Sequence, residues 1–341
     1  MRPQVFIVQG VPDEALNELR AVASVEMFDR VDRLISRREL RRAIRGCQYL
    51  WVLGEVPVDG AVMDTADLRL IAIMEIVSRS VDIDAATRRG IPVTTLPNLP
   101  AVTTSTAEHT LALLLALARR LPEAEGLIRA GRWHQYQSMA LLGTRLAGKR
   151  LGVVGLGNVG RRVAGYGQAL GMGVIYTDRR QLPDDEVPLG VEWRDLASLF
   201  GEADVIVICA TLTASSRGLI DRRLLGRMRP HALFVNTSRG QIVDEAALVE
   251  VLRDGRIAGA AIDVFEKEPP TPGGGPHPGL LALDNVILTP HLGTATRESR
   301  LEMARTVADG LVAAIDGRRP PNVANPQVYG EPAPPVPERI G

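Results

Sequence analysis

The sequence has few cysteines, few aromatic residues and no net charge. It contains 2 cysteines among 341 residues, and aromatic residues make up 4% of the chain. Cys47 and Cys209 stand in unrelated apolar surroundings, so we expect them to pack in the interior and not to bind a metal. Lysine and arginine together number 40, as do aspartate and glutamate. This balance gives no electrostatic reason to expect nucleic acid or an anionic membrane as a partner.

Long apolar runs are also missing. The longest, Leu111–Ala118, is shorter than the roughly 18–20 residues that a transmembrane helix needs. Met1 leads directly into a strand-like segment without the pattern of a signal peptide. We therefore expect a cytoplasmic protein that does not span a membrane. The length of 341 residues exceeds what one hydrophobic core usually serves, which predicts two domains.

Two stretches of the chain show the alternation of strand and helix patterns that is typical of parallel sheets. A long helical pattern over residues 103–121 separates the two stretches. The first stretch has helical patterns at 36–45 and 83–89, and strands are predicted at 4–9, 48–53, 68–73 and 91–96. The second has helical patterns at 193–200, 222–228 and 245–253, and strands are predicted at 150–154, 173–177, 204–210, 232–235, 257–262 and 285–288. Six strands suffice for a complete dinucleotide-binding sheet.

The predicted fold class is therefore α/β, with two parallel-sheet domains of Rossmann-like or flavodoxin-like type. Residues 103–291 are expected to form an NAD-binding domain inserted into a substrate domain. The substrate domain is expected to comprise residues 1–102 and 292–326, and the second segment includes a final helix at 294–315. Residues 327–341 form a proline-rich tail that we expect to be unstructured.

A glycine motif marks the cofactor site. Gly155, Gly157 and Gly160 fit the pattern G-x-G-x-x-G between a strand and a helix, and Asn158 and Val159 complete it. The helix N-terminus offers free N–H groups to phosphate. Asp178, 18 residues after the last glycine (178 − 160), is placed to accept hydrogen bonds from an adenosine ribose. The alternative is a glycine turn beside an unrelated surface aspartate.

The charge of Asp178 favours NAD over NADP, because a carboxylate repels a 2′-phosphate. Arg179 and Arg180 follow directly and leave NADP open as the alternative cofactor.

Three further residues that suit redox chemistry follow predicted strands. Arg239 can pair with the carboxylate of a 2-oxo acid. His291 can exchange the proton that the carbonyl oxygen gains, and Glu268 can hold the other ring nitrogen. The alternatives are a surface ion pair for Arg239 and a helix cap for His291. The remaining histidines, His109, His134, His231 and His277, are expected to have structural roles.

The sequence resembles the D-isomer-specific 2-hydroxyacid dehydrogenase family, which includes phosphoglycerate, glycerate and D-lactate dehydrogenases. The resemblance covers about residues 82–326 and rests on six stretches, 106–110, 152–160, 217–220, 235–240, 263–269 and 290–293. It implies an NAD-dependent enzyme acting on a 2-oxo or D-2-hydroxy acid, with Arg239, Glu268 and His291 in the roles above. It also implies that Asp263 lies near the nicotinamide carboxamide and that Thr237 contacts the cofactor through its backbone. Family members usually pair as homodimers through the nucleotide domain.

One segment departs from the family pattern. Between Ala72 and Asp82 the family has a glycine-containing loop that holds the substrate carboxylate, but residues 73–81 of this chain contain no glycine. Val77, Ser78 and Arg79 are the candidate substrate contacts. One hypothesis is that Arg79 binds a second anionic group on the substrate; the alternative is that it pairs with a neighbouring carboxylate.

Two other functions remain open at this point. One is a nucleotide-binding corepressor or sensor on the same fold, which would bind partners without turnover. The other is a relative of phosphite or formate dehydrogenases, although formate dehydrogenases place a glutamine where this chain has Glu268. The sequence leaves the identity of the 2-oxo acid open.

Overall fold

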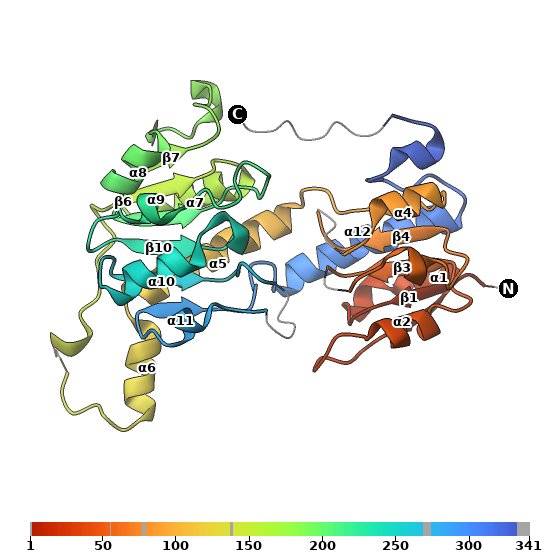
Figure 1. The fold of residues 1–341 in the computed structure, drawn as a ribbon, viewed down its shortest axis with the longest axis horizontal. Helices are drawn as coiled ribbons and strands as arrows, with labels where there is room; N and C mark the ends of the chain where they lie inside the picture. Colours follow the sequence, from red (N-terminus) through yellow and green to blue (C-terminus); the bar gives the residue numbers. More distant parts are fainter. Residues whose placement is uncertain (1, 55, 77–79, 137–138, 269–273, 333–341) are drawn as a thin grey trace. The chain divides into compact units, whose positions relative to one another are not determined.

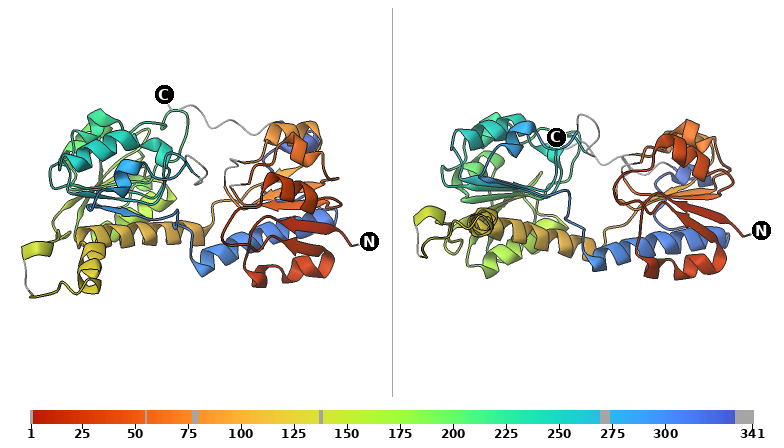
Figure 2. Two further views of the ribbon diagram at one scale, coloured as in Figure 1. Left: turned by 60° about the horizontal axis from the view of Figure 1, so that its bottom comes forward. Right: turned by 90° about the horizontal axis from the view of Figure 1, so that it is seen from below.

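The computed structural model describes residues 2–54, 56–76, 80–136, 139–268 and 274–332. The chain divides into two compact units. Unit 1 comprises residues 1–102 and 295–338, and unit 2 is built on residues 103–294. Each unit is a sheet with helices on both faces (Figures 1 and 2).

Unit 1 contains a five-stranded parallel sheet in the order β2-β1-β3-β4-β5, which is the flavodoxin-like order. Its strands are β1 (Gln4–Ile7), β2 (Ser24–Met27), β3 (Tyr49–Val52), β4 (Leu70–Ile73) and β5 (Val93–Thr94). The sequence patterns predicted four of these strands and missed β2. This edge strand has no buried residue, so it lacks the apolar run by which the other strands are recognised.

Helices on the two faces of this sheet bury alternate residues of its strands. Val5 and Ile7 face α1 (Asn17–Val22) and α12 (Arg297–Ile315), whereas Phe6 and Val8 face the other side. That side is covered by α2 (Arg37–Ala43), α3 (Gly60–Met63) and α4 (Ile83–Arg88). Ser36 and Glu39 form a capping box that fixes the start of α2. A short 3-10 helix, η1 (Asp13–Ala15), precedes α1.

The segment after α12 returns to the sheet of unit 1. Asn325 is buried, and its side chain accepts from the Val93 backbone N–H and donates to the Ile91 carbonyl. A 3-10 helix, η5 (Pro326–Tyr329), follows, and Arg319 pairs with Glu331. Ordered structure thus continues into the region expected to be a tail, because these contacts attach it to the domain.

Unit 2 contains a seven-stranded parallel sheet in the order β12-β11-β10-β9-β6-β7-β8. Its strands are β6 (Arg150–Val154), β7 (Gly173–Thr177), β8 (Val191–Trp193), β9 (Val205–Ile208), β10 (Leu233–Asn236), β11 (Gly259–Ile262) and β12 (Val286–Leu288). The prediction of six strands was short by one, and the helix expected from residue 193 begins at Leu196. β8 was missed because it is a short edge strand with only Val191 buried.

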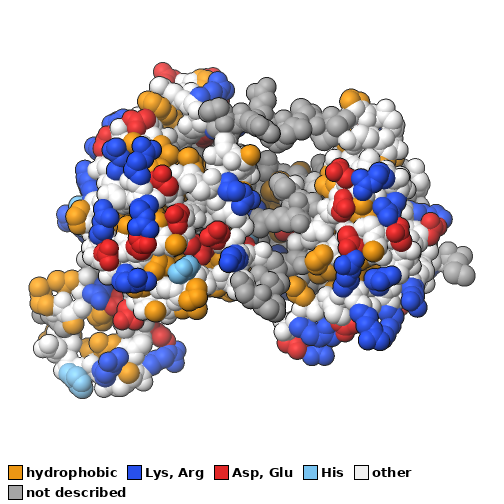
Figure 3. Space-filling view, viewed as in Figure 1, with side chains coloured by type: hydrophobic (Ala, Val, Ile, Leu, Met, Phe, Trp, Pro, Cys, Tyr) orange, Lys and Arg blue, Asp and Glu red, His pale blue; other side chains and the backbone are white. Residues whose placement is uncertain are grey.

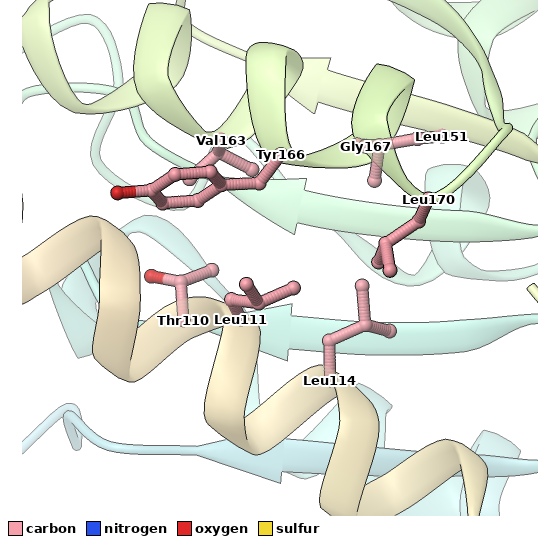
Figure 4. Close-up of a pocket in the computed structure, with 8 residues that line it drawn as sticks. All are labelled: Thr110, Leu111, Leu114, Leu151, Val163, Tyr166, Gly167 and Leu170. Atoms are coloured by element: carbon pink, nitrogen blue, oxygen red, sulfur yellow. The ribbon is translucent and has the colours of Figure 1, made fainter.

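Helices also cover both faces of the larger sheet. On one face lie α5 (Pro100–Ala118) and α7 (Asn158–Ala169), whose side chains meet over Leu151 of β6 (Figure 4). The space left between α5 and α7 measures about 10 Å³, which is about the minimum needed to hold one water molecule. The other face is covered by α8 (Leu196–Glu202), α9 (Arg222–Leu225), α10 (Glu245–Arg253) and α11 (Pro278–Leu281). The remaining elements are α6 (Leu121–Arg129), η2 (Met139–Leu141), η3 (Asp184–Glu186) and η4 (Gly240–Ile242).

Among the described residues, α5 alone is long and apolar enough to cross a membrane by length and composition. A core helix of a folded domain passes the same test, and Leu113, Leu114 and Leu117 of α5 are buried in the core of unit 2.

Candidate active site

The glycine motif connects β6 to α7 at the carboxyl end of the sheet. A Cβ atom on Gly160 would lie 2.1 Å from the Gly155 carbonyl oxygen, so only glycine lets α7 begin this close to the strand. A Cβ on Gly157 would meet nothing within 4 Å, and within the described structure no side chain caps the first turn of α7. Open space therefore lies beside uncapped N–H groups, as a bound pyrophosphate requires.

Asp178 follows β7 and lies next to this motif. Its Oδ2 accepts from the Leu156 backbone N–H at 2.8 Å, and its Oδ1 accepts from the Arg179 N–H at 2.7 Å. These bonds orient the carboxylate and still leave each oxygen a further lone pair. The open space at Gly157, the start of α7 at Asn158 and Val159, and the oriented Asp178 carboxylate are compatible with a dinucleotide site.

His291 and Glu268 come together as expected. The imidazole Nδ1 lies 2.9 Å from Glu268 Oε2, and the other carboxylate oxygen accepts from the Phe265 N–H at 2.6 Å. Because the carboxylate is held as an acceptor, it favours the tautomer in which Nδ1 carries a proton. The Nε2 atom is then the ring nitrogen that can exchange a proton with a ligand. The His291 side chain is 42% exposed.

The turn that carries His291 has an unusual backbone. His291 has a φ of 56°, in the left-handed region that few residues other than glycine adopt. Its N–H donates to the Asp263 carbonyl at 2.8 Å. The Asp263 carboxylate in turn accepts from Thr289 Oγ1 at 2.6 Å and from the N–H groups of Leu292 and Gly293 at 2.8 and 3.1 Å. Asp263, at the end of β11, thus organises the whole turn.

Burial alone would raise the pKa of Asp263, which is 0% exposed. Hydrogen bonds from His109, Thr289 and Leu292 outweigh that effect and hold the pKa below its usual value. The carboxylate therefore stays charged inside the protein.

Arg239 follows β10 in a turn that packs against the segment of Glu268. Asn236 fixes the turn, since its side chain donates to the Arg239 carbonyl at 3.1 Å and accepts from the Ser238 N–H at 3.1 Å. A Cβ on Gly240 would lie 1.9 Å from the Phe265 carbonyl carbon, so glycine alone permits this approach. Nη1 of Arg239 donates to the Ser238 carbonyl at 2.7 Å. The arginine thus belongs to the same edge of the sheet as Glu268.

The sequence interpretation missed the role of Glu245, the first residue of α10. This buried carboxylate accepts from the Glu266 N–H at 2.5 Å and from the His277 N–H at 3.2 Å. It therefore holds the segments on either side of Glu268. Burial raises its pKa, against the two backbone hydrogen bonds. An acidic residue at the start of a helix is common enough that its spacing alone gave no signal.

Two polar residues of α5 also support the site. Thr110 Oγ1 lies 2.6 Å from Thr237 Oγ1, beside the backbone expected to contact the cofactor. His109 Nε2 lies 3.1 Å from Asp263 Oδ1. The remaining histidines behave as expected where the structure shows a contact. His231 pairs with Asp204, and His277 caps α11 by accepting from the Gly279 N–H.

Val77, Ser78 and Arg79, the predicted substrate contacts, lie outside the described residues. Over the described ranges, no group of three or more histidine, cysteine, aspartate or glutamate side chains could hold a metal ion. The described part of the site therefore consists of residues that follow the strands of unit 2.

The chain is similar to known proteins over nearly its whole length. Residues 111–293 match the family described as "D-isomer specific 2-hydroxyacid dehydrogenase, NAD binding domain". The chain is 42% identical over 332 residues to a glyoxylate reductase from Aeropyrum pernix, covering 96% of this chain and 97% of that protein. A glyoxylate reductase from Pyrococcus furiosus is 36% identical over 333 residues, with the same coverage of 96% and 97%.

Solved structures with a similar fold are also known. The TT0316 protein from Thermus thermophilus superposes with a TM-score of 0.84 at 38% identity, covering 94% of this chain and 99% of that one. An NADPH-dependent glyoxylate/hydroxypyruvate reductase from Sinorhizobium meliloti, in complex with NADP and malonate, has a TM-score of 0.77 at 29% identity, with coverage of 95% and 97%.

Proposed function

This chain belongs to the D-isomer-specific 2-hydroxyacid dehydrogenase family, and we propose that it reduces glyoxylate or a similarly small 2-oxo acid with NADH. It is an oxidoreductase of the 2-hydroxyacid dehydrogenase type with an NAD-binding domain. The observation that carries the proposal is the pair of His291 Nδ1 and Glu268 Oε2 at 2.9 Å, at the sheet edge that bears the glycine motif. The names of the glyoxylate reductases support the choice of substrate.

His291 acts in this proposal as the acid of the reduction and the base of the reverse reaction. Its Nε2 gives a proton to the carbonyl oxygen as that oxygen gains negative charge. Glu268 holds the Nδ1 proton and stabilises the positive ring. When bound, the reduced nicotinamide supplies the hydride that goes to the 2-carbon of the substrate.

Arg239 binds the substrate in this proposal. A guanidinium can make two parallel hydrogen bonds, which suits a carboxylate next to a carbonyl group. The turn fixed by Asn236 and Gly240 limits the positions that the arginine head can reach. Binding through the carboxylate would orient the adjacent carbonyl toward His291, which supports selectivity for 2-oxo acids; a D-2-hydroxy acid is the proposed product where the product is chiral.

Asp178 selects the cofactor. Its carboxylate would accept hydrogen bonds from the ribose hydroxyls of NAD, and its charge would repel the 2′-phosphate of NADP. The reductase from Sinorhizobium meliloti with a similar fold is NADPH-dependent. NADP therefore remains the alternative for this chain, with Arg179 and Arg180 as the cations that would bind the phosphate.

A homodimer through unit 2 is the proposed assembly. Apolar side chains gather over α6 and the segment that follows it (Figure 3). Trp133, Tyr136 and Met139 are 62%, 78% and 77% exposed. An apolar surface of this kind usually marks a protein contact, and a second copy would bury it in both subunits at once because the interface of a twofold dimer is self-complementary.

The test is oxidation of NADH and NADPH by the purified protein against glyoxylate, hydroxypyruvate, pyruvate and larger 2-oxo acids. The proposal expects the highest kcat/KM with NADH and a small 2-oxo acid. Turnover of none of these acids, together with tight cofactor binding, would contradict it and favour a corepressor or sensor.

A further inference from the structure

Asp263 is a fully buried carboxylate with more donors than a helix cap or surface pair needs. Three of its donors, the Thr289 hydroxyl and the N–H groups of Leu292 and Gly293, come from the turn that carries His291. The fourth is His109 Nε2, 3.1 Å from Oδ1, on helix α5. Among the described contacts, this imidazole is the donor that joins the carboxylate to another element.

His109 is mostly buried and contacts the residues that form the turn of His291. Its side chain is 18% exposed, and Nε2 also lies 3.4 Å from Thr289 Oγ1. α5 packs against α7 and β6 (Figure 4), so the imidazole is anchored in the core of unit 2. The 3.1 Å contact spans 154 positions of the chain (263 − 109) and reaches the residue whose carbonyl accepts from the His291 N–H.

We propose that His109 is a positioning residue for the reaction, which holds the Asp263 carboxylate and through it the left-handed turn of His291. This inference rests on the proposed function of His291. An isolated carboxylate in an apolar interior is costly, so its donors must remain in place. Without the imidazole, the Asp263 carboxylate would need another hydrogen-bond donor or would become protonated. Either change would loosen the turn of His291. A displacement of about 1 Å at a proton donor can lower a rate by roughly 100-fold.

The chain contains a matched control for this idea. His231 Nε2 lies 2.6 Å from Oδ1 of Asp204, another mostly buried carboxylate of unit 2. Asp204 precedes β9, whereas Asp263 follows β11. Both pairs place an imidazole Nε2 on a buried carboxylate, at opposite ends of one parallel sheet, and Asp204 also accepts from Arg229. Of the two pairs, the one with His109 touches the turn of His291.

The experiment compares His109→Leu and His109→Gln with His231→Leu and His231→Gln in the full-length protein. We expect His109→Leu to lower kcat roughly 10–100-fold while KM changes by less than about threefold. His109→Gln keeps an N–H donor and should restore kcat to within about threefold of the wild type. The His231 variants should lower thermal stability without this loss of kcat.

Amide hydrogen exchange without cofactor provides a second readout. The peptide containing Leu292 and Gly293 should exchange faster in His109→Leu and keep its protection in both His231 variants. Binding of ADP-ribose should be unchanged, since the glycine motif and Asp178 are untouched. If His109→Leu does not fold, His109→Asn replaces it in both measurements. The asparagine side chain is shorter, so its N–H donor reaches less far toward Asp263.

Unchanged exchange and unchanged kcat in His109→Leu would overturn the inference, as would a failure of His109→Gln to restore either. An inactive wild type would count against the proposed function instead. The exchange of the turn would still test the structural link between His109 and Asp263.

Discussion

His291 joins a proton-exchanging ring to a backbone conformation that most side chains avoid. Its φ of 56° means that an alanine at this position would change the turn as well as the chemistry. Asparagine tolerates the left-handed region better than most residues, so it removes the imidazole with less disturbance. The useful variant at this position is therefore His291→Asn.

We expect His291→Asn to lower kcat at least about 100-fold, because it removes the proposed acid and base of the reaction. The affinity for NADH, measured by fluorescence titration, should stay nearly unchanged. The same replacement at His134, an exposed histidine, is the control and should leave turnover intact. Near-normal turnover in His291→Asn would show that the proton comes from another group.

Asp178 predicts the outcome of a second substitution. Asp178→Asn keeps the size of the side chain and removes its charge, so NADPH should become a better substrate. The ratio of kcat/KM for NADH to that for NADPH should fall at least about tenfold. The control is Asp184→Asn in η3, which also removes one negative charge but lies away from the end of β7. It should leave the ratio unchanged. A wild type that already prefers NADPH would refute the role given to Asp178.

At this scale the sequence predicted which residue types follow the strands, but not how they are supported. Glu268 and His291 meet as expected because parallel strands end at one edge of the sheet. The contact of His109 with Asp263 could not be predicted in the same way. It joins positions far apart in the chain, and no local pattern records such a distance.

Helix α7, which begins at the glycine motif, provides a test of cofactor binding. A Cβ at Gly157 would meet nothing within 4 Å, so Gly157→Ala should fold normally. It should lose affinity for NADH, because the methyl group would occupy the space proposed for the pyrophosphate. Calorimetric titration with NADH measures the loss, and thermal melting checks the fold.

Gly165, on the same helix α7, is the matched control. A Cβ there also meets nothing within 4 Å, so Gly165→Ala should raise stability by about 0.5–1 kcal/mol without affecting NADH binding. Equal NADH affinities for both variants would show that Gly157 does not face the cofactor.

The two strands that the sequence patterns missed share a physical cause. β2 and β8 are short edge strands with little buried surface, so neither has the apolar run by which strands are recognised. The central strands β3, β4, β9 and β10 are buried at every position and were all predicted. Burial on both faces, not strand propensity, made these strands visible in the sequence.

At the scale of the whole molecule, the proposed dimer can be tested by introducing charged side chains into its interface. Trp133→Asp combined with Met139→Asp should give a monomer, because two buried carboxylates per subunit would face an apolar partner. Light scattering after size-exclusion chromatography measures the mass of the assembly.

Leu189→Asp is the control, since Leu189 is 97% exposed but lies in another part of unit 2. It should leave the mass unchanged. A dimer that survives the double substitution would place the interface elsewhere.

The contact between His109 and Asp263 has a consequence for how such a protein can arise. The chain enters unit 2 at Thr103 and leaves it after Thr294, so His109 stands six residues after the start (109 − 103) and Thr289 five before the end (294 − 289). These two side chains lie 3.4 Å apart, which brings the two ends of unit 2 together. A domain whose ends meet can be placed in a surface connection of another domain without separating that connection's two sides. Unit 2 accordingly lies between residues 102 and 295 of unit 1 as a single insertion. The contact of His109 with Thr289 holds the two ends of that insertion close together.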